Sequence, residues 1–323
     1  MEKGDDLGSP RNKTTKGINF VVLSKKCAWF YYVAKLNQSQ IAKKIGLSKM
    51  RVHRLIAFAD KNGFVKTFVE GGFDKTTKYE VIIKQKYNLK LCEVIPNDED
   101  NSDPIQMLGA AGARFIMNQI NENKITEFGI GTGNTMNAVA KWLPKINKKI
   151  DFITLNGSLT SNNSIQIKTG INQIAEKTNG ECFNIGIPFI IESIEQKKLI
   201  EKINFIKKII NKASNTKIKL LSVGGLFESS QIVKSNIVSK ESIKKLKEKG
   251  AVGEVAGNFF DKEGNLILNK ETKKIIGAKI DSFKNSTTIL IAGGKNKISQ
   301  IQSVLKSGLF TGLITDEDTS KKI

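Results

Sequence analysis

The spacing of hydrophobic and polar positions along the chain changes near residue 104. From residue 19 to residue 58 the apolar residues recur at helical intervals, and the last helix of this stretch is expected to end near Asn62-Gly63. Beyond residue 104, short apolar runs typical of buried strands alternate with helical segments. The runs are ITEFGI, DFITL, IKLLSVG and TILIAGG, and the helical segments are residues 105–122, 134–143, 191–212, 241–249 and 296–307. This alternation predicts an α/β fold with a parallel sheet covered on both faces.

Composition along the chain predicts three parts. Residues 1–18 are polar without periodicity, which is typical of a disordered tail. Residues 97–104, NDEDNSDP, are acidic and rich in turn formers, and we interpret them as a linker. A helix-turn-helix domain with a connector would then occupy residues 19–96, and the α/β domain residues 97–323. In the connector, residues 64–89 predict a strand, a Gly-Gly turn and a helix from about Lys78, which would form a wing or a plain connection.

Residues 38–56, QSQIAKKIGLSKMRVHRLI, satisfy the requirements of a helix-turn-helix. Two closely crossing helices need a small residue at the crossing and a turn residue that tolerates positive φ, and Ala42 and Gly46 supply them. Ser48 can cap the second helix through its hydroxyl. The remaining core contacts are expected from Ile41, Ile45, Leu47, Val52 and Leu55.

With those positions buried, the second helix presents a polar face made of Ser48, Lys49, Met50, Arg51, His53 and Arg54. The chain holds only four arginines, and two of them lie here. Arginine can bind guanine through two parallel hydrogen bonds, whereas a lysine serves a phosphate as a point charge. This face therefore predicts sequence-specific binding to the major groove of double-stranded DNA. The alternative is an ordinary solvated helix face, and His53 is either a base or phosphate contact or a passive surface residue.

An aromatic run, WFYY at residues 29–32, precedes this motif. We expect these side chains in the core of the helical domain rather than on a surface that stacks against bases. Their helix, residues 25–36, should place Ala28, Tyr31, Tyr32 and Leu36 on or near one face.

Residues 125–143, ITEFGIGTGNTMNAVAKWL, predict a strand, a glycine-rich loop and a helix. The glycines let the backbone approach a ligand closely, and the N-terminus of a helix attracts anions. The loop has neither the lysine of a Walker loop nor the spacing of a dinucleotide-binding fingerprint. We interpret it as a phosphate cradle, with tight helix–strand packing as the alternative. Its candidate contacts are Gly129, Gly131, Thr132, Gly133, Asn134 and Thr135.

Two further stretches carry candidate binding groups. Residues 250–264, GAVGEVAGNFFDKEG, contain Glu254, Asn258 and Asp261 among glycines and aromatic residues. Residues 290–298, LIAGGKNKI, predict a strand and a Gly-Gly turn before Lys295 and Lys297. A lysine here, Lys297 in preference to Lys295, would neutralise a phosphate, and a carboxylate such as Glu254 would accept hydrogen bonds from sugar hydroxyls.

Overall composition adds little to this picture. The net charge of +21 suits an acidic partner such as nucleic acid, but an AT-rich coding sequence would also enrich lysine. Cys27, Cys92 and Cys182 are widely spaced without a CxxC motif, so we expect free thiols and neither disulfides nor a metal site. No leader or membrane-spanning run is evident, which predicts a cytoplasmic protein. Nothing indicates a cofactor.

Taken together, these stretches resemble the SorC family of sugar-binding transcriptional regulators. The resemblance starts at KCAWFYYVAKLNQSQIAKKIGLSKMRVHRLI and continues through YEVIIKQKYNLKLCEVIP, LGAAGARFI, FGIGTGNTM and AVGEVAGNFFDKEGN. It closes with IAGGKNKISQIQSVLKSGLFTGLITDE, so that it covers about residues 20–320 in order.

The resemblance implies a Rossmann-like domain related to sugar-phosphate isomerases and deaminases that serves as a sensor. It implies a phosphorylated sugar effector, a homodimer or homotetramer, phosphate contacts from Asn134, Thr135 and Lys297, and a sugar contact from Glu254. The chain departs from many members at Thr132 and Asn134, and it has Ser158 where some carry an arginine for a second phosphate. That departure argues against a bisphosphate effector.

Two other functions compete with a ligand-controlled regulator. An isomerase or deaminase would need an acid or base, and the sole histidine, His53, lies in the helix-turn-helix, although Glu254 or Asp261 could serve. We therefore predict that the chain is not an enzyme. A nonspecific DNA-binding protein would depend on the lysines alone and would show a steep salt dependence. In the preferred hypothesis, the effector changes the placement of subunits and hence the spacing of two recognition helices on DNA.

Overall fold

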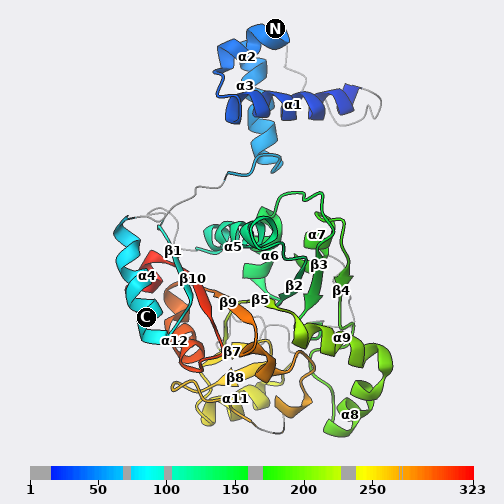
Figure 1. Cartoon of the computed structure of the whole chain (residues 1–323), viewed down its shortest axis with the longest axis vertical. Helices are drawn as coiled ribbons and strands as arrows, with labels where there is room; N and C mark the ends of the chain where they lie inside the picture. The colour runs from blue at the N-terminus through cyan, green and yellow to red at the C-terminus, as the bar shows by residue number, and fades with distance from the viewer. Residues whose placement is uncertain are drawn as a thin grey trace, which may run out of the picture. The chain divides into compact units, whose positions relative to one another are not determined.

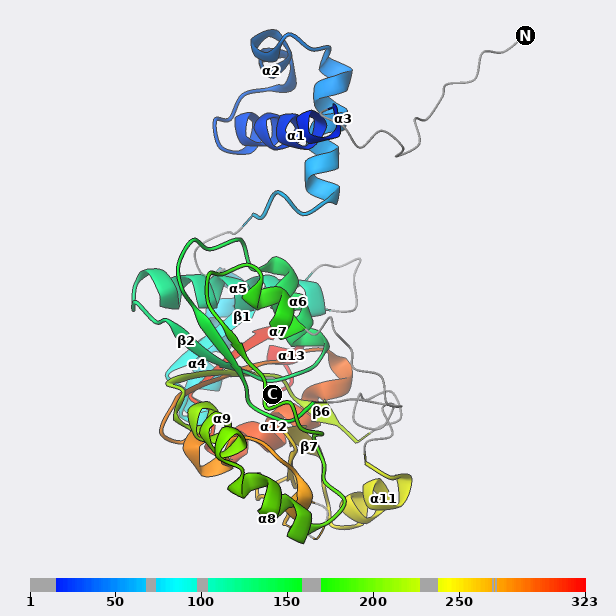
Figure 2. The same ribbon diagram turned by 90° about the vertical axis from the view of Figure 1, so that its right-hand side faces the viewer.

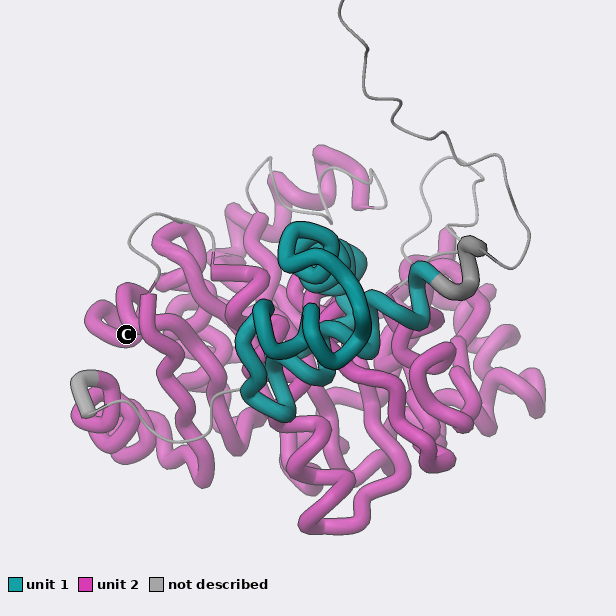
Figure 3. The backbone as a smooth tube through the Cα atoms, turned by 90° about the horizontal axis from the view of Figure 1, so that it is seen from above, with its two compact units in different colours: residues 1–69 teal, residues 70–323 magenta. Residues whose placement is uncertain are grey.

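The computed structural model describes residues 16–67, 74–97, 104–158, 170–226, 238–268, 270 and 272–323. The chain divides into two compact units, Met1–Val69 and Glu70–Ile323, shown in teal and magenta in Figure 3. Most of the predicted tail lies outside the described residues, but its last positions, 16–18, belong to a helix. No helix in the described ranges is both long and apolar enough to cross a membrane.

The N-terminal unit contains the helices α1 (Lys16–Tyr32), α2 (Gln38–Ile45) and α3 (Lys49–Lys61). Asn37 caps α2 in a capping box with Gln40, and Gly46 ends it in the left-handed region at φ 73°. The predicted end near Asn62-Gly63 is confirmed, because Asn62 is the residue that caps α3 at its C-terminus. Six buried residues form the core: Cys27, Ile41, Ala42, Val52, Leu55 and Ile56. Ile45 and Leu47 are half-buried against them, so the residues expected at the contacts between α2 and α3 lie in or against this core.

The aromatic run behaves differently from the prediction. Trp29 and Tyr31 are 55% and 37% exposed, whereas Phe30 and Tyr32 pack against the core half-buried. The reason is helical phase: Cys27 and Ala28 turn inward, which directs Trp29 and Tyr31 outward. The helix also ends at Tyr32, ahead of the predicted Leu36.

The connector belongs to the second unit, so the predicted boundary at residue 97 is wrong. Helix α4 (Asp74–Tyr87) buries Ile83 and Tyr87 in the core of the α/β unit, and strand β1 (Leu91–Ile95) pairs with its sheet. The helix begins four residues ahead of Lys78. Residues 64–67 form no strand, and the rest of the proposed wing lies outside the described residues.

A parallel sheet forms the centre of the second unit. Its order within the described residues is β1-β10-β9-β5-β2-β3-β4, and every pairing is parallel. The strands after β1 are β2 (Glu127–Ile130), β3 (Asp151–Thr154), β4 (Cys182–Phe183), β5 (Ile218–Leu221), β9 (Thr287–Ile291) and β10 (Gly312–Asp316). The four predicted strands are confirmed. Strands β1, β4 and β10 were not predicted, because β4 is very short and the other two include polar residues such as Glu93, Thr315 and Asp316.

Helices cover both faces of this sheet, as predicted (Figures 1 and 2). One face carries α5 (Ile105–Asn121), α6 (Asn134–Trp142) and α7 (Gly170–Ala175). The other carries α4, α9 (Asn204–Asn215) and α12 (Ile298–Lys306), whose apolar residues share one core cluster. The predicted helix at 191–212 is two helices, because Ile203 adopts extended backbone angles between α8 (Ile194–Lys202) and α9.

A smaller antiparallel sheet lies beside the main one. It consists of β6 (Gly224–Gly225), β7 (Gly253–Val255) and β8 (Asn258–Phe260), with α11 (Lys240–Glu248) preceding β7. A single turn of helix, α13 (Glu317–Ser320), follows β10 and packs against α4. The predicted strand at 218–224 thus belongs to both sheets, since β5 ends at Leu221 and β6 begins at Gly224.

Lys219 on the central strand β5 is fully buried. Its ammonium donates to Ser214 O at 3.0 Å, Thr216 O at 2.7 Å and Ser286 Oγ at 2.5 Å, and it forms no ion pair with a described carboxylate. Burial lowers the pKa of Lys219 to about 8. The folded protein therefore binds fewer protons than the unfolded chain between that pH and the ordinary lysine pKa, and its stability rises with pH across this window.

We predict that this rise is lost in Lys219→Met. The wild-type free energy of unfolding should increase between about pH 8 and pH 10.5 by on the order of 3 kcal/mol relative to the variant. Denaturant unfolding followed by circular dichroism at several pH values measures it, with the exposed Lys217→Met as the matched control. Parallel stability curves for wild type and Lys219→Met would contradict the assignment.

Candidate nucleic-acid interface and effector site

Helix α3 presents one buried and one polar side. Ser48 caps it, since the Ser48 hydroxyl accepts a hydrogen bond from the Arg51 N–H at 3.2 Å. Val52, Leu55, Ile56 and Ala59 are buried on the inner side. All six predicted DNA-contacting residues lie exposed on the outer side: Ser48, Lys49, Met50, Arg51, His53 and Arg54.

Positive charge dominates the N-terminal part of this outer side. The first turn of α3 contains no acidic residue, and α2 ends in the exposed Lys43 and Lys44. Gln38 Nε2 lies 3.3 Å from His53 Nδ1. Which of the two nitrogens donates depends on the imidazole tautomer, and the contact joins α2 to α3.

The strand order defines where a ligand can enter the α/β unit. The chain runs outward from β2 to β3 and β4 and then returns to β5 on the other side of β2. The carboxyl ends of β2 and β5 therefore flank a topological switch point, where open α/β sheets bind their ligands. The glycine-rich loop follows β2 at this point, as predicted.

The glycine-rich loop brings backbone donors to that edge. Gly131 N–H donates to Leu220 O at 2.8 Å, which ties the loop to β5. Gly133 has φ 125° and offers no side chain to cap α6, which begins at Asn134. Thr135 is buried and Asn134 exposed in this first turn. A helix N-terminus of this kind suits an anion such as phosphate.

Asn156, which the sequence analysis missed, completes this edge. It follows β3, is only 2% exposed, and donates its Nδ2 to Thr132 Oγ1 at 3.0 Å. Its Oδ1 is buried without a hydrogen-bond partner among the described residues. A buried acceptor without a donor is costly, so a ligand hydroxyl fits this position. The available signal was an asparagine directly after the apolar run DFITL, at the carboxyl end of a strand.

Glu254 lies over the glycines of β6. The two strands pair Gly224 with Glu254, and a Cβ on Gly224 would lie 2.7 Å from Glu254 Oε2. Glu254 Oε1 accepts a hydrogen bond from Gly257 N–H at 2.5 Å. Burial raises the pKa of Glu254 to about 7, although the Gly257 N–H acts in the opposite direction. Burial therefore favours the protonated form of this carboxyl group more than in an exposed glutamate.

The turn before Lys297 is held by residues at the end of β10. Gly294, at φ 102°, donates its N–H to Asp316 Oδ2 at 2.9 Å and to Thr319 Oγ1 at 2.8 Å. A Cβ on Gly293 would lie 1.9 Å from Asp316 Oδ2, so only glycine fits there. Lys297 ends the turn half-buried and Lys295 is exposed. Asp316 and Thr319 therefore position this turn, a role that the sequence analysis did not assign.

Asn258 and Asp261 are occupied locally. The Asp261 carboxylate accepts hydrogen bonds from the Glu263 and Asn265 N–H groups and from Asn265 Nδ2, and the Asn265 bonds contribute most to lowering its pKa. Asn258 donates its amide to Val255 O and Ala256 O in the turn between β7 and β8. Asp261 therefore stabilises a turn. Asn258 lines a cavity that neither Glu254 nor the glycine-rich loop lines.

Comparison with known proteins agrees with this architecture. A family model described as "Putative sugar-binding domain" matches residues 72–323. The chain is 30% identical over 302 residues to the erythritol catabolism regulatory protein EryD of Brucella abortus, covering 93% of this chain and 96% of that protein. It is 27% identical over 306 residues to the transcriptional regulator LsrR of Escherichia coli, covering 92% and 93%. The chain therefore belongs to the SorC family of sugar-binding transcriptional regulators.

A solved structure shares the fold over nearly the full length. The full-length sorbitol operon regulator SorC of Klebsiella pneumoniae gives a TM-score of 0.68 at 19% identity, covering 93% of this chain and 97% of that one. The expected family and fold class are thus confirmed. These relatives are regulators rather than enzymes, which agrees with the prediction of a non-enzyme.

Glu254 gives a prediction that needs no ligand. Its raised pKa means that the folded state binds more protons than the unfolded chain between the ordinary glutamate pKa and about pH 7, so stability falls as pH rises through this window. Glu254→Gln should remove the fall and stabilise the protein at pH 8 by roughly 1–3 kcal/mol. Thermal or denaturant unfolding at pH 5 and pH 8 tests this. A variant less stable than wild type at pH 8 would contradict it.

Proposed function

We propose that this chain binds operator DNA through α3 and that a phosphorylated sugar in the α/β unit sets its affinity for DNA. The observation that carries the proposal is the pairing of two features in one chain. The first is the exposed, cationic N-terminal part of α3, whose first turn contains no acidic residue. The second is a switch-point site that combines a helix N-terminus without a side-chain cap and a buried acceptor without a partner among the described residues. A regulator of this kind meets its operator in the cytoplasm.

The contacts to DNA follow from the geometry of α3. Arg51 and Arg54 would read guanine through two hydrogen bonds each, and Lys49 would contact a phosphate. His53 would contact a base or a phosphate, while Ser48 and Met50 would contact the groove wall. Specificity would then come from the arginines, and the remaining lysines would contribute the salt-dependent, sequence-independent part of the affinity.

The effector contacts follow from the edge of the sheet. The N–H groups of Thr132 and Gly133, with the side chains of Thr132, Asn134 and Thr135, would hold the phosphate, and Lys297 would balance its charge. Glu254 and Asn156 Oδ1 would accept hydrogen bonds from sugar or polyol hydroxyls. EryD is named for the catabolism of erythritol, a polyhydroxylated compound, and this name supports a ligand rich in hydroxyl groups. We do not assign such a contact to Asp261, whose carboxylate is already occupied.

The effector site has a direct connection to α4, the first described helix after the DNA-binding unit. Thr319 and Asp316 accept hydrogen bonds from the Gly294 N–H in the turn before Lys297. Thr319 lies in α13, and Asp316 caps the N-terminus of α13. Beyond α13, the Ile323 carbonyl accepts hydrogen bonds from Lys86 and from Tyr87 Oη, both on α4. A ligand that moves the Gly294 turn would therefore move α13, and α13 would in turn displace α4. In a homodimer or homotetramer, this displacement would change the spacing of two α3 helices on DNA.

If α3 reads the operator sequence, a substitution that keeps the positive charge of Arg54 should reduce sequence specificity. Arg54→Lys should weaken binding to a selected operator by about tenfold to a hundredfold, because lysine cannot make the paired contact to guanine. Binding to random duplex should stay within about twofold. Operator sequences selected from a random pool and titrated by fluorescence anisotropy measure both. Lys49→Gln is the control, since it should weaken both kinds of DNA alike, and an identical profile for the two variants would contradict the assignment.

The connection through α13 predicts that a substitution at Thr319 weakens the response of DNA binding to the effector. Thr319→Val removes one of the two acceptors of the Gly294 N–H and the hydroxyl that donates to Asp316 Oδ2, and it should weaken effector binding by about tenfold. Operator release should then require correspondingly more effector. Ser320→Ala is the matched control, because the Ser320 hydroxyl donates only to Glu317 O within the same helix. Equal effector responses in the two variants would exclude this route.

A further inference from the structure

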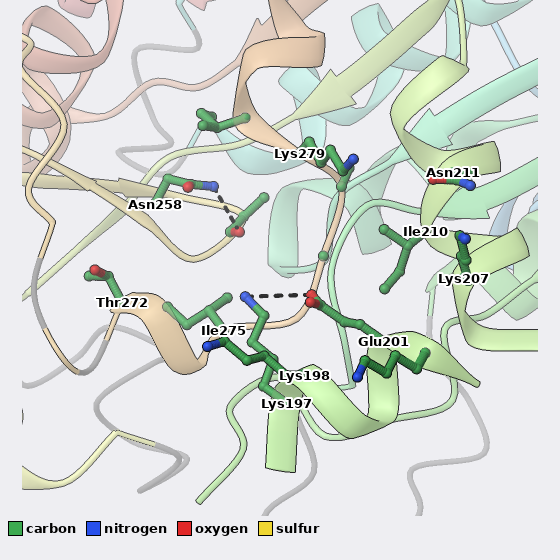
Figure 4. Close-up of a pocket in the computed structure, with 15 residues that line it drawn as sticks. Lys197, Lys198, Glu201, Lys207, Ile210, Asn211, Asn258, Thr272, Ile275 and Lys279 are labelled. Atoms are coloured by element: carbon green, nitrogen blue, oxygen red, sulfur yellow. Dashed lines mark hydrogen bonds and ion pairs between the residues drawn. The ribbon is translucent and has the colours of Figure 1, made fainter. Parts of the chain in front are cut away.

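A second cavity opens on the α8–α9 side of the α/β unit (Figure 4). It has a volume of about 590 Å³ and lies between these two helices, the segment at 272–280 and the turn between β7 and β8. None of the glycine-rich loop, Glu254 or Lys297 lines it. Its size is that of a small-molecule pocket, for which roughly 300–1,000 Å³ is typical.

The rim of this cavity is strongly cationic. Five of its fifteen lining residues are lysines, whereas lysine and arginine together account for 52 of the 323 residues of the chain. Lys197 forms an ion pair with Glu201 at 3.6 Å, and Glu201 is the only acidic residue among the described residues of the lining. Four lysines form no ion pair with any described residue: Lys198, Lys202, Lys207 and Lys279. Gathering these charges around one hollow raises the local potential and attracts an anion.

The floor of the cavity can hold the body of a ligand. Ile210 and Ala278 are buried there, and Ile275 is half-buried. Asn258 is held by its two bonds to Val255 O and Ala256 O, which leaves its Oδ1 without a hydrogen-bond partner among the residues that the structure describes. An apolar floor, an amide acceptor and a lysine rim together suit a small molecule with anionic groups, rather than a duplex.

The cavity shares a wall with the effector site. Gly277 lines the cavity and forms a β-bridge with Asn156, whose Nδ2 donates a hydrogen bond to Thr132 Oγ1 in the glycine-rich loop. Gly157 N–H donates to Ile276 O at 3.0 Å and Ala278 N–H donates to Leu155 O at 2.7 Å, so the two segments are joined on both sides of the bridge. A ligand that displaces the 275–279 segment would therefore move Asn156.

We propose that this cavity is a second regulatory site, which binds a small polyanion carrying two or more phosphate groups. The anion would bridge α8 and α9 across the break at Ile203 and would join both helices to Lys279. Through the Gly277–Asn156 bridge, its binding would change the affinity of the first site for its ligand. This site does not depend on the identity of the sugar bound at the glycine-rich loop.

The test uses the full-length chain and inorganic tripolyphosphate as the probe, titrated by calorimetry at physiological salt. Wild type should bind the probe, and the fourfold variant K198Q/K202Q/K207Q/K279Q should bind it at least tenfold more weakly. The matched control K240Q/K244Q/K247Q/K249Q removes four exposed lysines on and just after α11 and should bind it like wild type. Circular dichroism confirms that each variant is folded.

Three outcomes would overturn the proposal. An equal loss in the α11 control would mean that net charge alone attracts the probe. A loss in Lys297→Gln, with none in the fourfold cavity variant, would place the probe at the glycine-rich loop. Weakened binding of random duplex DNA by the cavity variant alone, with tripolyphosphate binding unchanged, would make the lysine rim a DNA contact. Failure of the sugar-phosphate site itself would leave the calorimetric result for the cavity unaffected.

Discussion

The parallel pairing of β2 with both β3 and β5 is the constraint on which the rest of the α/β unit depends. Parallel strands end at the same edge, so this pairing gathers loops from four distant parts of the chain: the glycine-rich loop, Asn156, the Gly224-Gly225 strand and the turn before Lys297. Glycine is required where these loops meet, because a Cβ on Gly224 or Gly293 would collide with a carboxylate. The close approach of backbone to Glu254 and Asp316 follows directly.

Two buried polar groups at the same edge lower the stability of the folded protein. The Asn156 Oδ1 is buried without a partner in the part of the chain that the structure describes. Burial raises the pKa of Glu254 to about 7, so the ionised form of Glu254 is penalised. A ligand that donates hydroxyl groups to both would relieve these costs, and its binding energy would include that relief. By contrast, Asp316 is fully engaged with Thr319 and the Gly294 N–H, and it gives the site a rigid side that leads to α4.

The sequence predicted the features that depend on local pattern and missed those that depend on tertiary contacts. The four apolar strands, the helix-turn-helix core and the Gly46 turn follow from spacing and residue type. The domain boundary was misplaced because the acidic segment at 97–104 resembles a linker, whereas only the pairing of β1 with β10 shows that the connector joins the sheet. Trp29 was expected in the core because an aromatic side chain does not reveal its helical phase. Asn156 and Asp316 were missed because each is a single polar residue whose role arises from a neighbour distant in the sequence.

The central claim is that the α/β unit recognises a phosphorylated sugar, and a thermal-shift comparison tests it most directly. The pure protein would be heated with a panel of sugar and polyol phosphates and with their unphosphorylated counterparts. A ligand that binds only the folded state raises the Tm by mass action. Our account predicts a shift with one phosphorylated compound, none with its unphosphorylated form, and loss of the shift in Lys297→Gln. No shift with any of them, while sequence-specific DNA binding persists, would contradict the account and leave the glycine-rich loop as a purely structural element.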